Sequence, residues 1–178
     1  DIGNPLNEKV RMGSLAGETQ RQEVREQVQK LLASSQIVYG SLDSVEVVDA
    51  DARSGAFISP VLLMNDQPHT SREPHEVEAF GPVSTIMPYR NMDDAIALSK
   101  LGKGSLVTTI VTADHREARQ YVIGAATHHG RILLLNQECA KENTGHGSPL
   151  PLLVHGGPGR AGGGEEMGGI RGVKHYLQ

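Results

Sequence analysis

A chain of 178 residues with 38% apolar side chains is long enough for one domain, or for a piece of a larger one, with a buried core. Its 17 Lys and Arg against 21 Asp and Glu give a formal net charge of −4, which argues against a nucleic-acid binder that neutralises phosphates. Aromatic residues make up 3%, and the single cysteine, Cys139, cannot form an internal disulfide, so we expect a cytoplasmic protein. No apolar run approaches the roughly 20 residues of a membrane span.

The first part of the chain predicts one helix followed by short β-prone segments. Over residues 19–34, apolar side chains recur at i, i+4, i+7 and i+8, which is typical of an amphipathic helix. Thr19, with Gln22 three residues later, fits a capping box at its start. Three further segments are expected here: a strand over 37–39, a β-prone stretch over 56–64, and an exposed polar loop over 65–76.

The rest of the chain alternates predicted strands and helices. Asn91 and Asp114 stand where helix N-caps are expected, and Gly102 stands where the first of these helices should end. The expected elements are a strand over 83–89, a helix over 91–101, a strand over 106–112, a helix after 114 and a strand over 132–135. Apolar strands separated by amphipathic helices are typical of βαβ units. The predicted fold class is therefore α/β, a parallel βαβ sheet with helices on both faces.

Ligands of open α/β sheets bind beyond the carboxyl ends of the strands, which here means residues 112–114 and 136–147. The second segment holds Cys139 and His146. Cys139 with His146 or His155 could form a thiol nucleophile and its base. Sequence spacing alone does not show whether the thiol and the imidazole lie within hydrogen-bond reach. A lone cysteine in a loop more often has no catalytic part, which is the interpretation we favour.

Two other patterns have a structural interpretation beside a functional one. Gly157, Gly159 and Gly162 satisfy the dinucleotide-binding pattern G-x-G-x-x-G. More glycines follow where a helix should be under way, which favours a tightly packed backbone segment instead. The adjacent pair His128-His129 lacks the C-x-x-C or H-x-x-x-H spacing that places ligands on one face, so no metal site is predicted.

A carboxylate, Glu78, stands two residues before an aromatic ring, Phe80, and a Gly-Pro pair follows at the start of a predicted strand. A carboxylate held rigidly beside a flat apolar ring could bind a diol while the ring packs against a sugar or a heterocycle. Each hydrogen bond to a charged acceptor contributes about 1.5 to 3 kcal/mol. From these residues alone, a solvated glutamate at an ordinary strand entry is an equally good interpretation.

The segment Glu78-Ala79-Phe80-Gly81-Pro82 resembles the E-x-F-G-P motif of the aldehyde dehydrogenase superfamily. Other motifs of that superfamily have counterparts in the same order: Gly3-Asn4-Pro5, the glycine turn Met12-Gly13, the strand Gly55–Pro60, the strand Gly130–Asn136 and the glycine-rich ending Gly156–Gly169. The resemblance covers essentially the whole chain. The chain is therefore identified as a member of this superfamily.

A narrower resemblance comes from the run Ala140–Pro151 followed by Val154–Glu166. These residues are similar to the aldehyde dehydrogenase half of the bifunctional ring-opening proteins of phenylacetate degradation. That family oxidises a CoA-linked semialdehyde to the acid with NADP. The semialdehyde dehydrogenase of the benzoyl-CoA pathway is an alternative. A second alternative, of another class, is a non-catalytic binding or assembly module that keeps half of the fold.

The resemblance implies that residues 1–178 are the C-terminal part of the catalytic domain of an NAD(P)-dependent aldehyde dehydrogenase. It implies a thiolate that adds to the aldehyde, hydride transfer to the nicotinamide, and a glutamate-activated water that hydrolyses the thioester. Glu78 would bind the nicotinamide ribose hydroxyls, and Phe80 would pack near the nicotinamide. Asn136, His146 and His155 would line the substrate tunnel.

Several parts of the family have no counterpart in this sequence: the G-Q-x-C nucleophile segment, the E-x-G-G general-base segment, the cofactor domain and the oligomerisation strand. We therefore expect no catalytic residue in this chain and no activity of the chain alone. For the full-length protein we expect NADP or NAD as cofactor, a small-molecule aldehyde linked to CoA as substrate, and a homo-oligomer. Nucleic acid, membranes and metals are not expected as partners.

Overall fold

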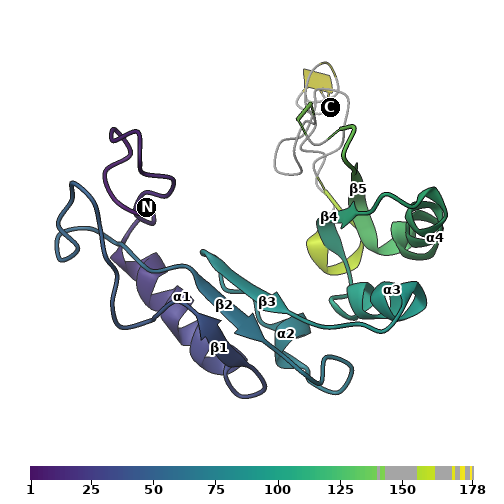
Figure 1. The fold of residues 1–178 in the computed structure, drawn as a ribbon, viewed down its shortest axis with the longest axis horizontal. Helices are drawn as coiled ribbons and strands as arrows, with labels where there is room; N and C mark the ends of the chain where they lie inside the picture. Colours follow the sequence, from purple (N-terminus) through teal and green to yellow (C-terminus); the bar gives the residue numbers. More distant parts are fainter. Residues whose placement is uncertain (140, 143–155, 163–169, 171–172, 175–176, 178) are drawn as a thin grey trace. The chain divides into compact units, whose positions relative to one another are not determined.

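The computed structural model describes residues 1–139, 141–142, 156–162, 170, 173–174 and 177. The chain divides into two compact units, Asp1–Pro88 and Tyr89–Gln178 (Figure 1). The first unit contains α1 (Glu18–Leu31), β1 (Gln36–Tyr39), β2 (Val61–Met64), α2 (Glu73–Glu76) and β3 (Val83–Ile86). The second contains α3 (Met92–Leu101), β4 (Ser105–Val111), α4 (His115–Ala125), η1 (Ala126–His128), β5 (His129–Leu135) and η2 (Gly159–Ala161). None of the helices in the described ranges is long and apolar enough to cross a membrane.

The first unit is a three-stranded sheet of order β1-β2-β3 with α1 packed against it. β2 and β3 are parallel, in the register Val61↔Val83 to Met64↔Ile86. β1 pairs antiparallel with β2, so an antiparallel edge strand joins a parallel pair. The apolar stripe predicted for the helix is confirmed at Val24, Val28 and Leu31, which are buried against the sheet, whereas Leu32 is half-buried and follows the end of α1. The core cluster consists of Val24, Val28, Leu31, Leu42, Ile58, Val61 and Leu63.

The start of α1 differs from the sequence prediction. The N-cap is Gly17, in an extended conformation and without a side chain to cap the helix, so the capping box expected from Thr19 and Gln22 is wrong. Gln20, the third helical residue, reaches back instead, and its Oε1 accepts a hydrogen bond of 3.0 Å from the Ala16 backbone N–H. Thr19 therefore lies inside the helix. The sequence prediction missed the true start because the N-cap is a glycine, which has no polar side chain to mark the position.

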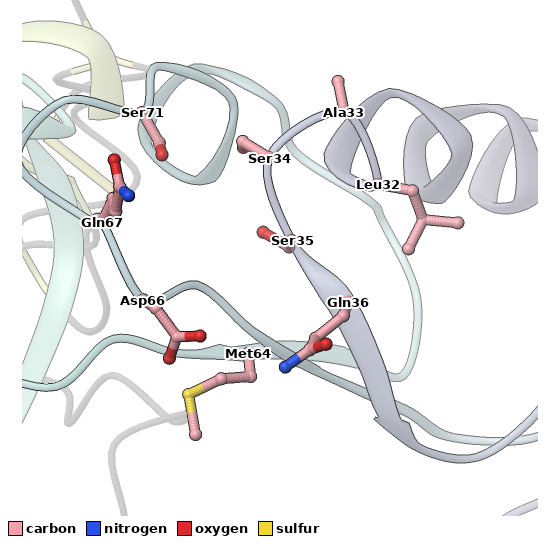
Figure 2. A pocket seen from close by; sticks show the side chains of 9 residues that line it. All are labelled: Leu32, Ala33, Ser34, Ser35, Gln36, Met64, Asp66, Gln67 and Ser71. Carbon is pink, nitrogen blue, oxygen red and sulfur yellow. The ribbon is translucent and has the colours of Figure 1, made fainter.

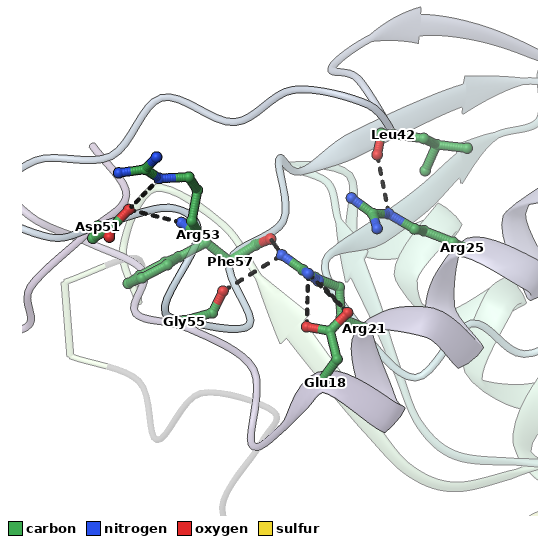
Figure 3. Close-up of polar contacts among 8 residues, drawn as sticks. All are labelled: Glu18, Arg21, Arg25, Leu42, Asp51, Arg53, Gly55 and Phe57. Carbon is green, nitrogen blue, oxygen red and sulfur yellow. Dashed lines mark hydrogen bonds and ion pairs between the residues drawn. The ribbon is translucent and has the colours of Figure 1, made fainter.

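Two arginines one turn apart on α1 hold the backbone that approaches the sheet (Figure 3). Arg21 Nη1 lies 3.4 Å from the Gly55 carbonyl oxygen and 3.5 Å from that of Phe57 and donates to both. Arg25 Nε donates to the Leu42 carbonyl oxygen at 3.1 Å. The long irregular segment between β1 and β2 is thus attached to the polar flank of α1, while the apolar stripe of the helix faces the core.

The polar segment after β2 is less exposed than the sequence suggests. Asn65 has no exposed surface; its Nδ2 donates to the Ser34 carbonyl oxygen at 2.6 Å, and its Oδ1 accepts from the Gln67 N–H at 3.0 Å. Residues Glu73–Glu76 form the short helix α2. The prediction of an exposed loop over 65–76 is therefore wrong at Asn65, which is buried because its amide bonds to backbone groups of Ser34 and Gln67, and at residues 73–76, which are helical.

The second unit is a βαβ unit, as the sequence predicts. β4 and β5 pair in parallel from Ser105↔His129 to Val111↔Leu135, and α4 connects them. Both predicted caps are confirmed: the Asn91 side chain accepts from the Asp94 N–H, and that of Asp114 accepts from the Arg116 N–H. The core cluster consists of Ile96, Ile110, Tyr121 and Ala125, with Met92 and Ile132 packed against it. The α/β fold class is confirmed.

Candidate functional site

The segment between α2 and β3 presents Glu78 and Phe80 to solvent. Exposure alternates along it: Val77 and Ala79 pack against the core cluster of the first unit, whereas Glu78 is exposed and Phe80 is 75% exposed. Residues two apart in an extended segment point to the same side. The carboxylate and the aromatic ring therefore stand on the outward side of one short segment.

This segment is tied to both of its neighbours. Gln20 Nε2 of α1 donates to the Phe80 carbonyl oxygen at 2.8 Å, and the Val61 N–H of β2 donates to the Pro82 carbonyl oxygen at 2.9 Å. Gly81 lies directly on Val24, because a Cβ placed on it would come within 2.7 Å of Val24 Cγ2. The backbone that carries Glu78 and Phe80 is thus held between a helix and a strand.

A small groove of about 260 Å³ adjoins Glu78. The groove is lined by Leu31, Pro74, Val77, Glu78, Ala79, Val83, Thr85 and Met87. Within the described ranges, no side chain pairs with the Glu78 carboxylate, so its oxygens are available as acceptors. An ionised carboxylate is an acceptor without donors, which fits the two hydroxyls of a ribose. The exposed ring of Phe80 offers a flat apolar surface for a heterocycle.

In the second unit, the polar groups after the strands build turns. Thr112 Oγ1, at the end of β4, donates to Glu117 Oε2 at 2.9 Å and accepts from the Asp114 N–H at 3.1 Å. Asn136 Oδ1, after β5, accepts from the N–H groups of Glu138 at 2.9 Å and Cys139 at 3.1 Å. The side-chain carbonyl of Asn136 is therefore engaged in an Asx-type turn.

Cys139 belongs to the same turn, where its Sγ accepts from the Asn136 N–H at 3.3 Å. It is partly exposed and is the one free cysteine of the sequence. His146 and His155, the other residues expected to line a substrate tunnel, lie outside the described residues. The pairing of Cys139 with either histidine therefore stays a prediction from the sequence.

Two of the three glycines of the G-x-G-x-x-G pattern, Gly157 and Gly159, pack against backbone atoms. A Cβ on Gly157 would lie 2.3 Å from the Ser105 carbonyl oxygen, and one on Gly159 would lie 2.2 Å from that of Lys103. Gly159 and Gly162 have φ values of +57° and +74°, and the short turn η2 stands where the pattern requires a helix. The tightly packed backbone segment is the interpretation that the structure confirms.

A buried histidine lies at the start of β5. His129 Nδ1 is 2.6 Å from Ser105 Oγ, and its ring stacks on Tyr121 with centroids 6.4 Å apart. Burial, with a smaller effect from the neighbouring His128, lowers the pKa of His129. The preceding His128 bonds to the Thr127 hydroxyl instead. Among the residues that can be described, no three His, Cys, Asp or Glu side chains come close enough to hold a metal ion.

A second cavity, of about 440 Å³, lies at the carboxyl end of α1 (Figure 2). It is lined by Leu32, Ala33, Ser34, Ser35, Gln36, Met64, Asp66, Gln67 and Ser71. Asp66 is the one charged residue in this described lining, and the remaining polar groups are hydroxyls and amides. The cavity offers neither an aromatic surface nor a cation for a phosphate. The segment with Glu78 and Phe80 is therefore a better candidate for a cofactor than this cavity.

Similarity to known proteins identifies the family of this chain. A family model of aldehyde dehydrogenases matches residues 1–178. The chain belongs to the aldehyde dehydrogenase family. It is 52% identical over 169 residues to Protein MaoC of Klebsiella aerogenes, which covers 94% of this chain and 48% of that protein. It is 39% identical over 157 residues to a 3,4-dehydroadipyl-CoA semialdehyde dehydrogenase of Aromatoleum evansii, which covers 88% of this chain and 30% of that protein.

Solved structures of aldehyde dehydrogenases share the fold. The betaine aldehyde dehydrogenase of Staphylococcus aureus, in complex with NAD+, matches with a TM-score of 0.79 at 20% identity, over 99% of this chain and 32% of that one. Aldehyde dehydrogenase C of Pseudomonas syringae, with NAD+ and octanal, matches with a TM-score of 0.75 at 24% identity, over 98% of this chain and 32% of that one. The present chain thus spans half or less of the length of the relatives that it matches.

Sequence reasoning missed Gln20. Its side chain bonds to the backbone of the segment that carries Glu78 and Phe80, although the two lie far apart in the sequence. The available signal was Gly17 followed at the third helical position by a glutamine, which fits the reach-back half of a capping box. Nothing in the sequence indicates that the same amide also bonds to Phe80.

Proposed function

We propose that residues 1–178 form the C-terminal part of the catalytic domain of an NAD(P)-dependent aldehyde dehydrogenase, with Glu78 and Phe80 on the nicotinamide side of its cofactor site. The observation that carries the proposal is the clamped segment on which an available carboxylate and an exposed aromatic ring point outward together. Membership of the family and the NAD+ complexes of its structural neighbours support it.

The bound cofactor would supply the acceptor for a hydride from the aldehyde carbon. The residues of this chain would orient it. Glu78 would accept hydrogen bonds from the two ribose hydroxyls, which limits rotation of the sugar. Phe80 would cover the adjoining heterocycle and displace water from one side of it. Because the backbone of this segment is tied to α1 and β2, little backbone conformational entropy remains to be lost on binding.

For the substrate we propose a CoA-linked semialdehyde, and for the pathway the degradation of phenylacetate. The 39% identity to a relative named 3,4-dehydroadipyl-CoA semialdehyde dehydrogenase supports the CoA-linked semialdehyde. The pathway rests on the resemblance of the runs Ala140–Pro151 and Val154–Glu166 to the ring-opening proteins of phenylacetate degradation. We further propose NADP as the cofactor, a cytoplasmic location, and a homo-oligomeric full-length protein. Asn136, His146 and His155 would line the substrate tunnel. Cys139 would have no catalytic part, and the nucleophile would come from outside this chain.

The test is the substitution Glu78→Gln in the full-length enzyme, followed by single-turnover hydride transfer and by titration of cofactor and aldehyde binding. Loss of the charged acceptor removes about 1.5 to 3 kcal/mol of hydrogen bonding, so hydride transfer should slow by about ten- to a hundredfold. Binding of the aldehyde should change less. Glu76→Gln is the matched control, because Glu76 is an exposed carboxylate on α2 that pairs with Arg72. Unchanged hydride transfer in Glu78→Gln would refute the ribose role.

A further inference from the structure

The side chain of Gln20 connects the start of α1 with the segment that carries Glu78 and Phe80. We infer that Gln20 is a positioning residue for this pair, acting through the Phe80 backbone without touching the cofactor. The inference rests on the proposed function of Glu78 and Phe80. It assigns a role to a helix residue that no family motif of the sequence includes.

The two hydrogen bonds of Gln20 fix the orientation of its amide. The backbone N–H of Ala16 can only donate, so the atom of Gln20 that lies 3.0 Å from it must be Oε1. The carbonyl of Phe80 can only accept, so the atom 2.8 Å from it must be Nε2. The partners therefore exclude the flipped amide, and the side chain is held at both ends.

Contacts to the 78–82 segment lie on one face of α1. Gln20 and Val24 are one turn apart, and they contact consecutive residues, Phe80 and Gly81. The Glu78 carboxylate itself has no partner among the residues the structure describes. The backbone therefore fixes the point from which the Glu78 side chain extends, and Gln20 connects this backbone to α1 two residues away.

Loss of this tether should affect geometry more than stability. The hydrogen bond between Gln20 and Phe80 is exposed to solvent, so water can replace the lost donor at little cost in folding free energy. Reaction geometry is less tolerant, because a misplacement of about 1 Å can cost about a hundredfold in rate. A partial release of the segment should therefore reduce hydride transfer while the protein stays folded.

The test uses Gln20→Glu in the full-length enzyme. This isosteric change keeps an oxygen for the Ala16 N–H and removes the donor to Phe80. Gln22→Glu is the matched control: it makes the same change in charge within the same helix, and among the described residues the Gln22 side chain bonds along the helix alone, to Glu26 at 3.1 Å. If Gln20→Glu does not yield folded protein, Gln20→Met, a neutral side chain of similar length without a donor, takes its place under the same criteria.

Two readouts report on positioning. In the cofactor-free enzyme, hydrogen exchange of the peptide covering residues 77–83 should accelerate in Gln20→Glu and stay unchanged in Gln22→Glu. In the loaded enzyme, hydride transfer should slow by about tenfold in Gln20→Glu, within the range that misplacement produces. Exchange and hydride transfer that both match the control would overturn the inference.

A double-mutant cycle with Glu78→Gln separates this inference from the proposed function. If Gln20 acts through the segment, most of the effect of Gln20→Glu on hydride transfer should disappear in the Glu78→Gln background. Effects that simply add would show that Gln20 acts elsewhere and would overturn the inference. If Glu78→Gln alone leaves hydride transfer unchanged, the proposed function fails, whatever Gln20→Glu does to exchange.

Discussion

Gly81→Ala tests whether close packing between α1 and the 78–82 segment sets the position of Glu78 and Phe80. An added Cβ would lie 2.7 Å from Val24 Cγ2 and 3.2 Å from Cγ1. Carbon atoms in good contact are about 3.5 to 4.0 Å apart, so the shortfall is about 1 Å. Val24 is only 1% exposed, and as a β-branched residue in a helix it has one strongly preferred χ1 rotamer, so it cannot easily move away.

The segment must therefore move away from α1. Overpacking of this kind costs about 1 to 3 kcal/mol of folding free energy. The movement would also stretch the bond between Gln20 and Phe80, because Phe80 immediately precedes the substituted residue. We expect a lower midpoint of thermal unfolding in the full-length enzyme, together with weaker cofactor binding measured by fluorescence titration.

Two further variants isolate the steric cause. Gly13→Ala is the control, because a Cβ on Gly13 meets no atom within 4 Å. Val24→Ala removes both methyl groups that the new Cβ would strike, so Gly81→Ala combined with Val24→Ala should be less destabilised than the sum of the single variants. The coupling should lie in the range of about 0.5 to 3 kcal/mol that touching residues show. Strict additivity, or an unchanged midpoint in Gly81→Ala, would refute the packing argument.

Three other predictions concern the second unit. Because burial lowers the pKa of His129, this histidine binds a proton more readily in the unfolded chain than in the folded one. The midpoint of thermal unfolding should therefore fall as the pH drops below about 6.5. The fall should be smaller in His129→Asn than in the parent protein. Asn91→Ala should cost about 0.5 to 2 kcal/mol in denaturant unfolding, since it removes the acceptor for the Asp94 N–H, whereas Asn91→Ser should restore most of the loss. Cys139→Ser should leave the activity of the full-length enzyme nearly intact, because a hydroxyl can take the place of Sγ in the turn; a loss of several orders of magnitude would show a catalytic thiol.

Local patterns of residues predicted most of the individual elements. The apolar stripe of α1, the caps Asn91 and Asp114, and the βαβ order of the second unit are all present as expected. Each depends on interactions within a few residues or on side-chain periodicity, both of which a sequence displays directly. The ends of elements were predicted less accurately. β5 begins at His129, three residues before the expected strand. Its first residues pair with β4 but are not apolar, so a search for apolar runs does not include them.

For the candidate site, the carboxylate two residues before an aromatic ring and the resemblance to the E-x-F-G-P motif were enough to single out Glu78 and Phe80. The partners that hold them could not be inferred, because the contacts of Gln20 with Phe80 and of Val24 with Gly81 join positions about 60 residues apart. The same holds for Asn65, a polar residue in a polar stretch that is buried only because it bonds to Ser34 and Gln67. Contacts of this kind exist once the chain has folded, and no local pattern records them.

The family, the α/β class and the choice of Glu78 and Phe80 as candidate site residues follow from the order of residues along the chain, since motifs and periodicity are local properties. The attachment of that pair to α1 depends on residues distant in the sequence. The same is true of the close packing of Gly157 against Ser105, the first residue of β4, and of Gly159 against Lys103 just before that strand. Tertiary packing determines these features. The hydrogen bond of 2.8 Å from Gln20 needs the Phe80 carbonyl beside it, and a glycine is required only where another segment lies too close for a Cβ.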